Sequence, residues 1–210
     1  MKTADFIKRV RFDFNDMDAD RVEDPIIINY LNEAVQEIYK LNPSRFLKTV
    51  EVKLEDGDLQ TPCCCDLLYS VDALIDENGI KVGEVRAIDQ RANVAFGKRQ
   101  CTTKSPYARS YNKIANSDNQ FIVDPPVSPN ETIHARLTCA VLPVPLGVND
   151  IFPAEITAYY AALVDYVLYR LFGAETESVS SQNKSMAFYK SFTENVLNEE
   201  KIRQGFIQKT

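Results

Sequence analysis

The sequence predicts an α+β protein, with a helical bundle formed by the N- and C-terminal helices and an inserted antiparallel β-domain. Apolar residues recur at helical spacing near both ends of the chain, whereas they alternate with polar residues in the middle. Residues 151–172, IFPAEITAYYAALVDYVLYRLF, are apolar over most of their helical surface and predict a central helix. We therefore assign residues 1–45 and 146–203 to the bundle, 46–145 to a β-rich domain and 204–210 to a C-terminal tail.

Two amphipathic helices open the chain. The first follows Thr3, and the second begins at Asp24 and Pro25, a helix cap followed by a residue suited to the first turn. The second helix is expected to end before Pro43. The apolar faces are Phe6, Ile7 and Val10 in the first helix and Ile27, Tyr30, Leu31, Ala34, Val35, Ile38 and Tyr39 in the second. Each helix is apolar on one side only, so both are expected to pack in the bundle.

Extended segments follow Phe46, where the period of the apolar residues falls to two. Val50, Val52 and Leu54 alternate with charged residues before the turn sequence DGD at residues 56–58. Further strands are expected at residues 67–75, 80–85, 121–123 and 133–141, with Asn78-Gly79 as a hairpin turn and DPPVSPNE as a second turn.

The central helix carries three charges after its first residue: Glu155, Asp165 and Arg170. Three charges in about twenty residues are too costly in hydrocarbon, so the helix is not expected to span a membrane. Asp150 or Asn149 is expected to cap its start, and Gly173 its end.

The last helix is expected from Ser181 to Arg203. Its apolar stripe consists of Met186, Tyr189, Phe192 and Val196. Gly205 is expected to end the helix, which leaves Phe206 and Ile207 as apolar side chains in the tail. Gly205, Phe206 and Ile207 are therefore candidates to bind a neighbouring protein, with a plain disordered end as the alternative.

The composition limits the classes of function. With 24 Lys and Arg against 30 Asp and Glu, the net charge is −6, which argues against a general nucleic-acid coat. The N-terminal sequence MKTADFIKRVRFDF has no apolar run, so no signal peptide is expected. In a cytosol the five Cys should be reduced, and their odd number fits a reduced set.

Two clusters contain residue types that bind metal ions. Asp16, Asp18 and Asp20 have the spacing of a calcium loop, but Arg21 and Ile27 stand where such a loop needs Gly and Glu, so a solvated acidic linker is expected. The run Cys63–Cys65 cannot converge on one metal ion, because adjacent side chains in an extended segment point to opposite faces. Small buried thiols at the start of a strand are expected there instead.

No catalytic motif accompanies the single histidine, His134, which is expected to be an exposed strand residue. We therefore expect no enzymatic activity, no cofactor and no bound metal. An enzyme whose site carries none of the searched motifs remains an alternative.

The segment from residue 86 to residue 113 departs from the average charge of the chain. Seven basic residues accompany a single acidic residue, Asp89: Arg86, Arg91, Lys98, Arg99, Lys104, Arg109 and Lys113. Tyr107 and Tyr111 lie among them, a combination that suits contact with phosphate or with an acidic neighbour. An ordinary solvated loop is the alternative interpretation.

The order of these features resembles the head-to-tail connector (adaptor) proteins of tailed bacteriophages, including the tail tubular protein A type. YLNEAVQEIYKLNPSRF resembles the second helix of that family and its first strand, and LQTPCCCDLLYSVDAL resembles a segment in which a proline and an aspartate precede a strand. FIVDPP, LTCAVLPVPL and IFPAEITAYYAALVDYVLYRLFGAE resemble the end of its β-domain and its long helix, and MAFYKSFTENVL resembles the closing helix. The Cys run and the basic segment are not part of the pattern.

The resemblance implies a virion structural protein at the head–tail junction, made in the bacterial host cytoplasm. It further implies a homo-oligomeric, twelvefold ring that contacts the portal protein and the tail or neck proteins, with possible transient contact between its lumen and genomic DNA. A ring requires heterologous interfaces, which apolar surface on residues 151–172 could supply. The alternative function is a nucleic-acid-binding accessory protein that uses residues 86–113.

Overall fold

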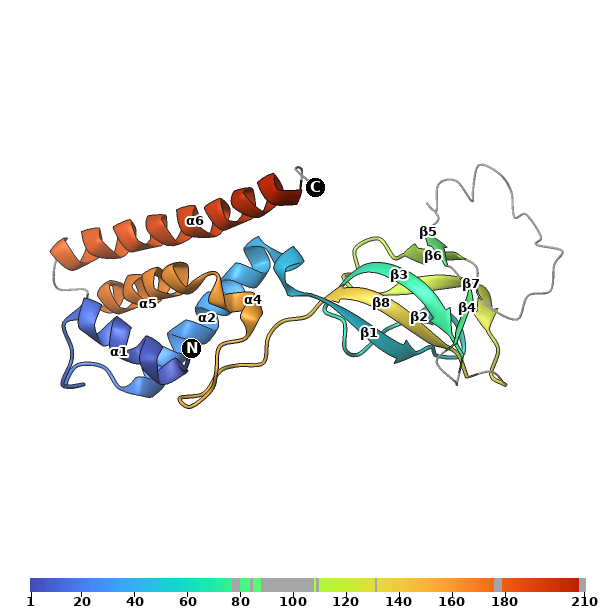
Figure 1. Cartoon of the computed structure of the whole chain (residues 1–210), viewed down its shortest axis with the longest axis horizontal. Helices are drawn as coiled ribbons and strands as arrows, with labels where there is room; N and C mark the ends of the chain where they lie inside the picture. The colour runs from blue at the N-terminus through green and yellow to red at the C-terminus, as the bar shows by residue number, and fades with distance from the viewer. Residues whose placement is uncertain are drawn as a thin grey trace. The chain divides into compact units, whose positions relative to one another are not determined.

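The computed structural model describes residues 1–76, 80–83, 85–87, 108, 110–130, 132–175 and 179–207. Within these ranges the chain divides into two compact units. Unit 1 comprises Met1–Arg45 and Leu142–Thr210, and unit 2 comprises Phe46–Val141. Unit 1 is helical and unit 2 is built from strands (Figure 1). The α+β fold, with a bundle from both ends of the chain and an inserted β-domain, is confirmed.

The helices of unit 1 pack around α5, which contacts α1, α2 and α6. The helices are α1 (Thr3–Phe14), α2 (Asp24–Leu41), α4 (Ala154–Thr157), α5 (Tyr160–Ala174) and α6 (Val179–Ile207). The side chains buried among them include Phe6, Val10, Ile27, Leu31, Ala34, Ile38, Leu163, Val167, Leu171, Phe192 and Val196. The helical periodicity thus placed most of the core correctly.

The expected single helix over residues 151–172 is wrong, because the chain leaves the helical conformation at Tyr159 and divides it into α4 and α5. Tyr159 is buried, and its hydroxyl accepts a hydrogen bond from Asn42 Nδ2 at 3.1 Å. The expected cap is also wrong: Pro153 occupies the cap position of α4, and Asp150 Oδ2 accepts a bond from the Gly147 N–H instead.

Gly173 does not end the central helix but lies inside α5. A Cβ atom at this position would lie 3.1 Å from the Ser185 hydroxyl oxygen. The Ser185 hydroxyl donates to the Tyr169 carbonyl oxygen at 3.0 Å. Glycine on α5 and serine on α6 therefore allow the two helices to approach closely, and Figure 1 shows them side by side and antiparallel.

The apolar stripe predicted for the last helix is correct in part. Phe192 and Val196 are buried, whereas Met186 and Tyr189 are exposed. Ser185 and Ser181 take the buried positions two and three turns before Phe192 because the close contact with α5 leaves room only for small side chains. The helix also begins earlier and ends later than expected.

Two four-stranded sheets form unit 2, in the orders β1-β8-β3-β4 and β2-β7-β6-β5. All pairs are antiparallel except β5 with β6. A 3₁₀ turn, η1 (Pro43–Phe46), precedes them, and the strands are β1 (Leu47–Lys53), β2 (Gly57–Gln60), β3 (Leu67–Ile75), β4 (Lys81–Gly83), β5 (Arg86–Ala87), β6 (Ser110–Lys113), β7 (Phe121–Val127) and β8 (His134–Ala140). One cluster of buried side chains, which includes Leu68, Leu74, Phe121, Val123, Ile133 and Leu137, forms the core of the unit.

Two details of unit 2 differ from expectation. The sequence DPPVSPNE was predicted as a turn, yet Asp124–Val127 continue β7. The ladder with β6 covers only residues 121–124, so the prolines at 125 and 126 fall where no β6 partner requires an N–H donor. Strands β3 and β4 do pair antiparallel as a hairpin, but its expected turn, Asn78-Gly79, lies outside the described residues.

Candidate interaction surfaces

Most of the basic residues predicted to bind a partner lie outside the described residues: Arg91, Lys98, Arg99, Lys104 and Arg109, together with Tyr107. Arg86 is described and exposed on β5, where it pairs with Ser110. The structure therefore brings none of the other predicted basic residues next to Arg86 within its described part.

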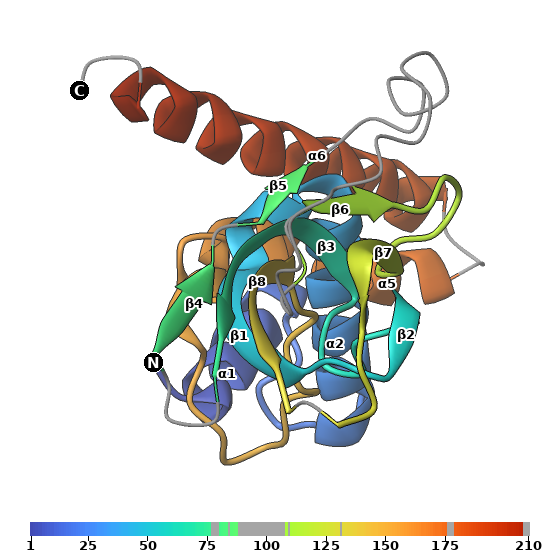
Figure 2. The ribbon, with the colours of Figure 1, turned by 90° about the vertical axis from the view of Figure 1, so that its right-hand side faces the viewer.

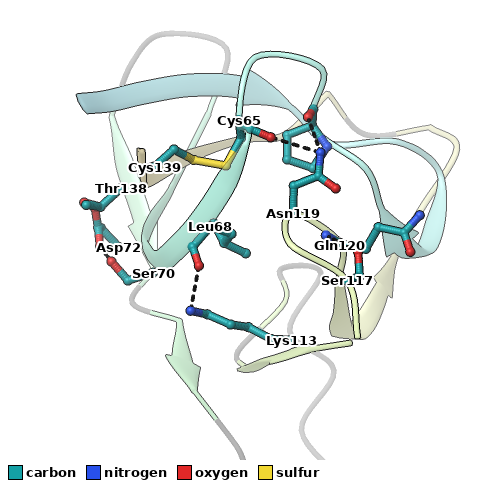
Figure 3. The surroundings of a disulfide bond; sticks show 11 residues. Cys65, Leu68, Ser70, Asp72, Lys113, Ser117, Asn119, Gln120, Thr138 and Cys139 are labelled. Carbon is teal, nitrogen blue, oxygen red and sulfur yellow. Dashed lines mark hydrogen bonds between the residues drawn. A yellow bond between two sulfur atoms is a disulfide. The ribbon is translucent and has the colours of Figure 1, made fainter. Parts of the chain in front are cut away.

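Tyr111 and Lys113, two candidate contacts of the basic segment, both interact within unit 2. The Tyr111 side chain is buried and packs edge-on against Phe121, with 6.3 Å between ring centroids. Lys113 Nζ donates to the Leu68 carbonyl oxygen at 2.7 Å (Figure 3), and desolvation by burial lowers the pKa of its ammonium group. Both side chains connect β6 to the rest of unit 2. Because the two residues are two positions apart in the short strand SYNK, alternation places them on the same face.

The predicted tail residues Gly205, Phe206 and Ile207 belong to the last turns of α6. The expectation that Gly205 ends the helix is therefore wrong, and residues 208–210 lie outside the described residues. A helix interior tolerates glycine at a cost of about 1 kcal/mol, which the preceding turns of α6 evidently offset.

The acidic linker after α1 is organised by a buried ion-pair cluster and not merely solvated. Arg11 Nη1 lies 2.8 Å from Asp16 Oδ2, and their side chains are only 8% and 3% exposed. Arg11 also donates to the carboxylate of Asp24 and to the carbonyl oxygen of Val22. The Asp16 carboxylate additionally accepts bonds from the backbone N–H groups of Arg21 and Val22. The cluster thereby fixes both ends of the α1–α2 loop.

The same loop is tied to the chain between α5 and α6. Arg21 pairs with Glu175 and lies over the Phe14 ring, 4.3 Å from its centroid. The Ser181 hydroxyl donates to the other oxygen of the Glu175 carboxylate at 2.9 Å. Residues expected to form a solvated acidic linker instead hold the end of unit 1 where α1, α5 and α6 meet.

The contact between α5 and α6 is aromatic and polar. Tyr166 packs edge-on against Phe192, with 5.0 Å between ring centroids. Asp165 Oδ2 accepts hydrogen bonds from Ser191 at 2.7 Å and from Asn195 at 2.9 Å. Desolvation by burial raises the pKa of Asp165, although these two bonds oppose the rise. The carboxylate is therefore a site at which pH acts on the α5–α6 contact.

The outer face of α6 carries apolar side chains that the described residues of unit 1 do not cover. Val179 and Met186 are each 73% exposed, and Leu197 is 48% exposed. At 100° per residue these three project within about 20° of one line, whereas the buried Phe192 and Val196 project about 100–140° away. We call Val179, Met186 and Leu197 the α6 stripe. By contrast, most large apolar side chains of α5 are buried within unit 1, so within residues 151–172 the expected surplus apolar surface is found at Ile151, before α4.

A second set of exposed apolar residues lies in the segment before α4. Val144, Val148 and Ile151 are 82%, 40% and 66% exposed, and we call them the 144–151 patch. The Asn32 side chain holds this segment, because its Nδ2 donates to the Leu146 carbonyl oxygen at 3.0 Å and its Oδ1 accepts from the Leu146 N–H at 2.8 Å. Within unit 1, α6 and this segment lie on opposite sides of α5 in both views (Figures 1 and 2).

The Cys run differs from expectation in two respects. Cys65 forms a disulfide with Cys139 in this structure, whereas five reduced Cys were expected for a chain in a cytosol, and Cys63 and Cys64 are exposed where buried thiols were expected. The bond joins residues 74 positions apart, because β3 and β8 are neighbours in one sheet. Asn119 Nδ2 donates to the carbonyl oxygens of Pro62 and Cys65, at 3.5 and 2.9 Å, and fixes the turn that carries the exposed thiols (Figure 3).

In the described ranges, no group of three or more His, Cys, Asp or Glu side chains could hold a metal ion. His134 lies on β8 opposite Lys53 and Ile75 and is partly buried. None of the helices in the described part of the chain is long and apolar enough to cross a membrane.

The sequence as a whole matches a known protein family. The model of the SU10 adaptor protein family matches residues 1–206, nearly the whole chain, and the chain belongs to that family. No curated protein matches the chain. Membership implies a structural, adaptor role in a phage virion and not an enzymatic one.

Proposed function

We propose that this SU10 adaptor protein is a head-to-tail connector, twelve copies of which form a ring between the portal and the tail of the virion. Membership of the adaptor family is the observation that carries the proposal. The ring contacts the portal protein on one side and tail or neck proteins on the other. Its lumen admits transient contact with genomic DNA. The chain is made in the bacterial host cytoplasm before it joins the virion.

The apolar surfaces of unit 1 support ring formation. A closed ring needs a heterologous interface, in which two different surfaces of the same subunit meet. The α6 stripe and the 144–151 patch are two such surfaces. The helix that carries the stripe and the segment that carries the patch lie on opposite sides of α5 (Figure 1). Contact between the α6 stripe of one copy and the 144–151 patch of the next would remove both from water and leave no surface of either kind unpaired in a closed ring.

The mass of the assembled particle tests the ring. Twelve copies of a 23.8 kDa chain weigh about 286 kDa, a value that sedimentation or native mass spectrometry distinguishes from other closed rings. We expect Met186→Glu with Leu197→Glu to abolish the ring and leave the thermal melt unchanged. Asn198→Glu is the matched control, because Asn198 is exposed on α6 about 100° away from Leu197. A parent chain that stays monomeric at high concentration and with portal particles would refute the proposal.

The end of α6 is the proposed portal contact. Gly205, Phe206 and Ile207 lie at the end of a long helix, where a partner could bind them. Truncation after Arg203 should leave the thermal melt of the subunit intact and abolish co-sedimentation with portal particles. Weak contacts repeated around a ring add up through avidity, so the loss should be clearest for assembled rings. Undiminished co-sedimentation would show that the portal binds elsewhere.

The competing function, nucleic-acid binding through residues 86–113, loses one of its candidate contacts, because Tyr111 is buried. Lys113 is exposed, although its Nζ donates a hydrogen bond to the Leu68 carbonyl oxygen. Arg86 remains exposed. A salt titration of DNA binding separates the two functions, since real phosphate contacts give a steep loss of affinity with salt. A steep dependence that Arg86→Ala reduces would favour the competing function.

A further inference from the structure

A buried disulfide and two exposed thiols lie within one short turn of unit 2. Cys65 is 2% exposed and Cys139 is fully buried, whereas Cys63 and Cys64 are exposed. Thiol–disulfide exchange requires a thiolate to approach one sulfur atom of a disulfide directly. A reagent in solution therefore has no access to the Cys65 and Cys139 sulfur atoms in the folded unit, although it can reach Cys63 and Cys64.

The turn places an exposed thiol beside the buried pair. The carbonyl oxygens of Pro62 and Cys65 both accept hydrogen bonds from Asn119 Nδ2, so the two ends of the four-residue turn are held together (Figure 3). Cys63 and Cys64 are the central residues of this turn. Two Cα–Cα steps of about 3.8 Å, bent by a turn, bring Cys63 and Cys65 into the separation of about 4.4–6.8 Å that a disulfide spans.

Cys63 fits the role of an exchanging thiol better than Cys64. A disulfide between the adjacent residues Cys64 and Cys65 would close a small ring across a planar peptide bond, which resists the distortion. Desolvation, and next the neighbouring Cys63, raise the pKa of the Cys64 thiol. Less of Cys64 is therefore present as the reactive thiolate at neutral pH.

The site has room for a small reagent. A surface cavity of about 340 Å³ is lined by Cys63 and Cys64, with Lys53, Glu55 and Thr61 among the polar residues around it. Small-molecule sites in proteins begin at about this volume. A tripeptide disulfide can therefore bring one of its sulfur atoms to Cys63 without opening unit 2.

We propose that Cys63 relays oxidation from a small-molecule disulfide in solution to the buried Cys65 and Cys139 thiols. In the first step the Cys63 thiolate attacks the reagent, forms a mixed disulfide and releases one molecule of thiol. The Cys65 thiolate then attacks the Cys63 sulfur and expels the second molecule of thiol. Finally the Cys139 thiolate attacks the Cys65 sulfur and expels the Cys63 thiolate, which is thereby regenerated. Overall two chain thiols are oxidised and one disulfide is reduced to two thiols.

The relay makes the Cys65–Cys139 cross-link of the adaptor depend on whether the surrounding medium is reducing or oxidising. A chain made in a reducing cytosol folds with Cys65 and Cys139 as thiols, and it acquires the bond between β3 and β8 when it meets an oxidising medium. Cys63, regenerated in the last step, is available for the reverse reaction. This chemistry belongs to a single subunit, so its test does not depend on ring formation.

The rate of disulfide formation tests the relay. Reduced, folded subunits are freed of reductant and treated with oxidised glutathione, then quenched with acid and alkylated for peptide mass spectrometry. Tryptic cleavage separates residues 54–81, which carry Cys63, Cys64 and Cys65, from the peptide that contains Cys139. We expect Cys63→Ser to form the Cys65–Cys139 bond at least tenfold more slowly than the parent. The matched control Cys64→Ser, which removes the neighbouring exposed thiol, should stay within twofold of the parent.

A second variant traps the intermediate. In Cys139→Ser the last step cannot occur, so a Cys63–Cys65 disulfide should accumulate, and peptide 54–81 should then carry one alkyl group, on Cys64, where the reduced peptide carries three. Thermal melts of the reduced proteins check that each variant is folded before oxidation. A Cys63→Ser rate less than tenfold below that of the parent, or failure of the parent to form the Cys65–Cys139 bond, overturns the relay.

Discussion

Replacement of Arg11 by methionine tests whether the cluster after α1 holds unit 1 together. Arg9 and Arg11 lie on the same helix, and each is 2.8 Å from a carboxylate oxygen, of Asp13 and Asp16 respectively. The two pairs differ in burial: the Arg9 and Asp13 side chains are 56% and 20% exposed, against 8% and 3% for Arg11 and Asp16. An exposed pair four residues apart contributes about 0.3–0.5 kcal/mol, whereas removal of one partner from a buried pair costs about 3–5 kcal/mol.

Urea unfolding followed by far-ultraviolet circular dichroism measures the difference, because the described α-helices all lie in unit 1. With a slope of about 2 kcal/mol per molar urea, Arg11→Met should lower the midpoint by about 1.5–2.5 M and Arg9→Met by no more than about 0.25 M. Asp16→Asn should restore part of the loss in the Arg11→Met background, because the cost comes mainly from a buried charge without its partner. Equal midpoints for Arg11→Met and Arg9→Met would refute the reasoning.

Three further changes test the packing of unit 1. Leu163→Asp places a charge at a fully buried position of α5 and should cost several kcal/mol, enough to unfold the bundle. The control Lys53→Ala, at an exposed strand position, should shift the melting temperature by less than about two degrees. A folded Leu163→Asp variant would contradict the core assignment. Asn32→Ala leaves the Leu146 N–H and carbonyl groups without their side-chain partner and should cost about 1–3 kcal/mol. Hydrogen exchange at the Leu146 amide should become faster. An unchanged exchange rate would disprove this role of Asn32. Because the pKa of Asp165 is raised, its carboxyl group binds a proton more tightly in the native state than in the unfolded state. The stability of the parent relative to Asp165→Asn should therefore fall as the pH rises from about 4 to 7. A stability difference that does not vary with pH would exclude the raised pKa.

Local patterns predicted the elements whose burial is decided within one helix or strand. The apolar positions of α2 are an example: Ile27, Leu31, Ala34 and Ile38 were predicted from spacing and are buried. Alternation likewise predicted the buried Ala135 and Leu137 in β8 and the buried Leu54 directly after β1. In these cases the solvent-facing side is already marked by charged residues in the same element, so no information about distant parts of the chain is needed.

The errors arise where burial depends on a partner that is distant in the sequence. Arg11 is buried because Asp16 and Asp24 meet it after the chain has turned, which a helical wheel cannot show. The Cys65–Cys139 bond requires β8 to lie beside β3, an arrangement that depends on the whole topology of unit 2. For the basic segment, the choice between a binding surface and a solvated loop stays a prediction, because five of its seven cations lie outside the described residues.

The α6 stripe shows why core residues and interface residues are hard to separate from sequence. Met186 and Phe192 have similar apolar character, so a periodicity search put both on the buried face. Only the close contact with α5, made possible by Gly173 and Ser185, decides that the face with Phe192 turns inward. Met186 is left in water, at a cost that only a further partner can remove. The residues that a sequence search misplaces on such a helix are therefore the first to examine for assembly contacts.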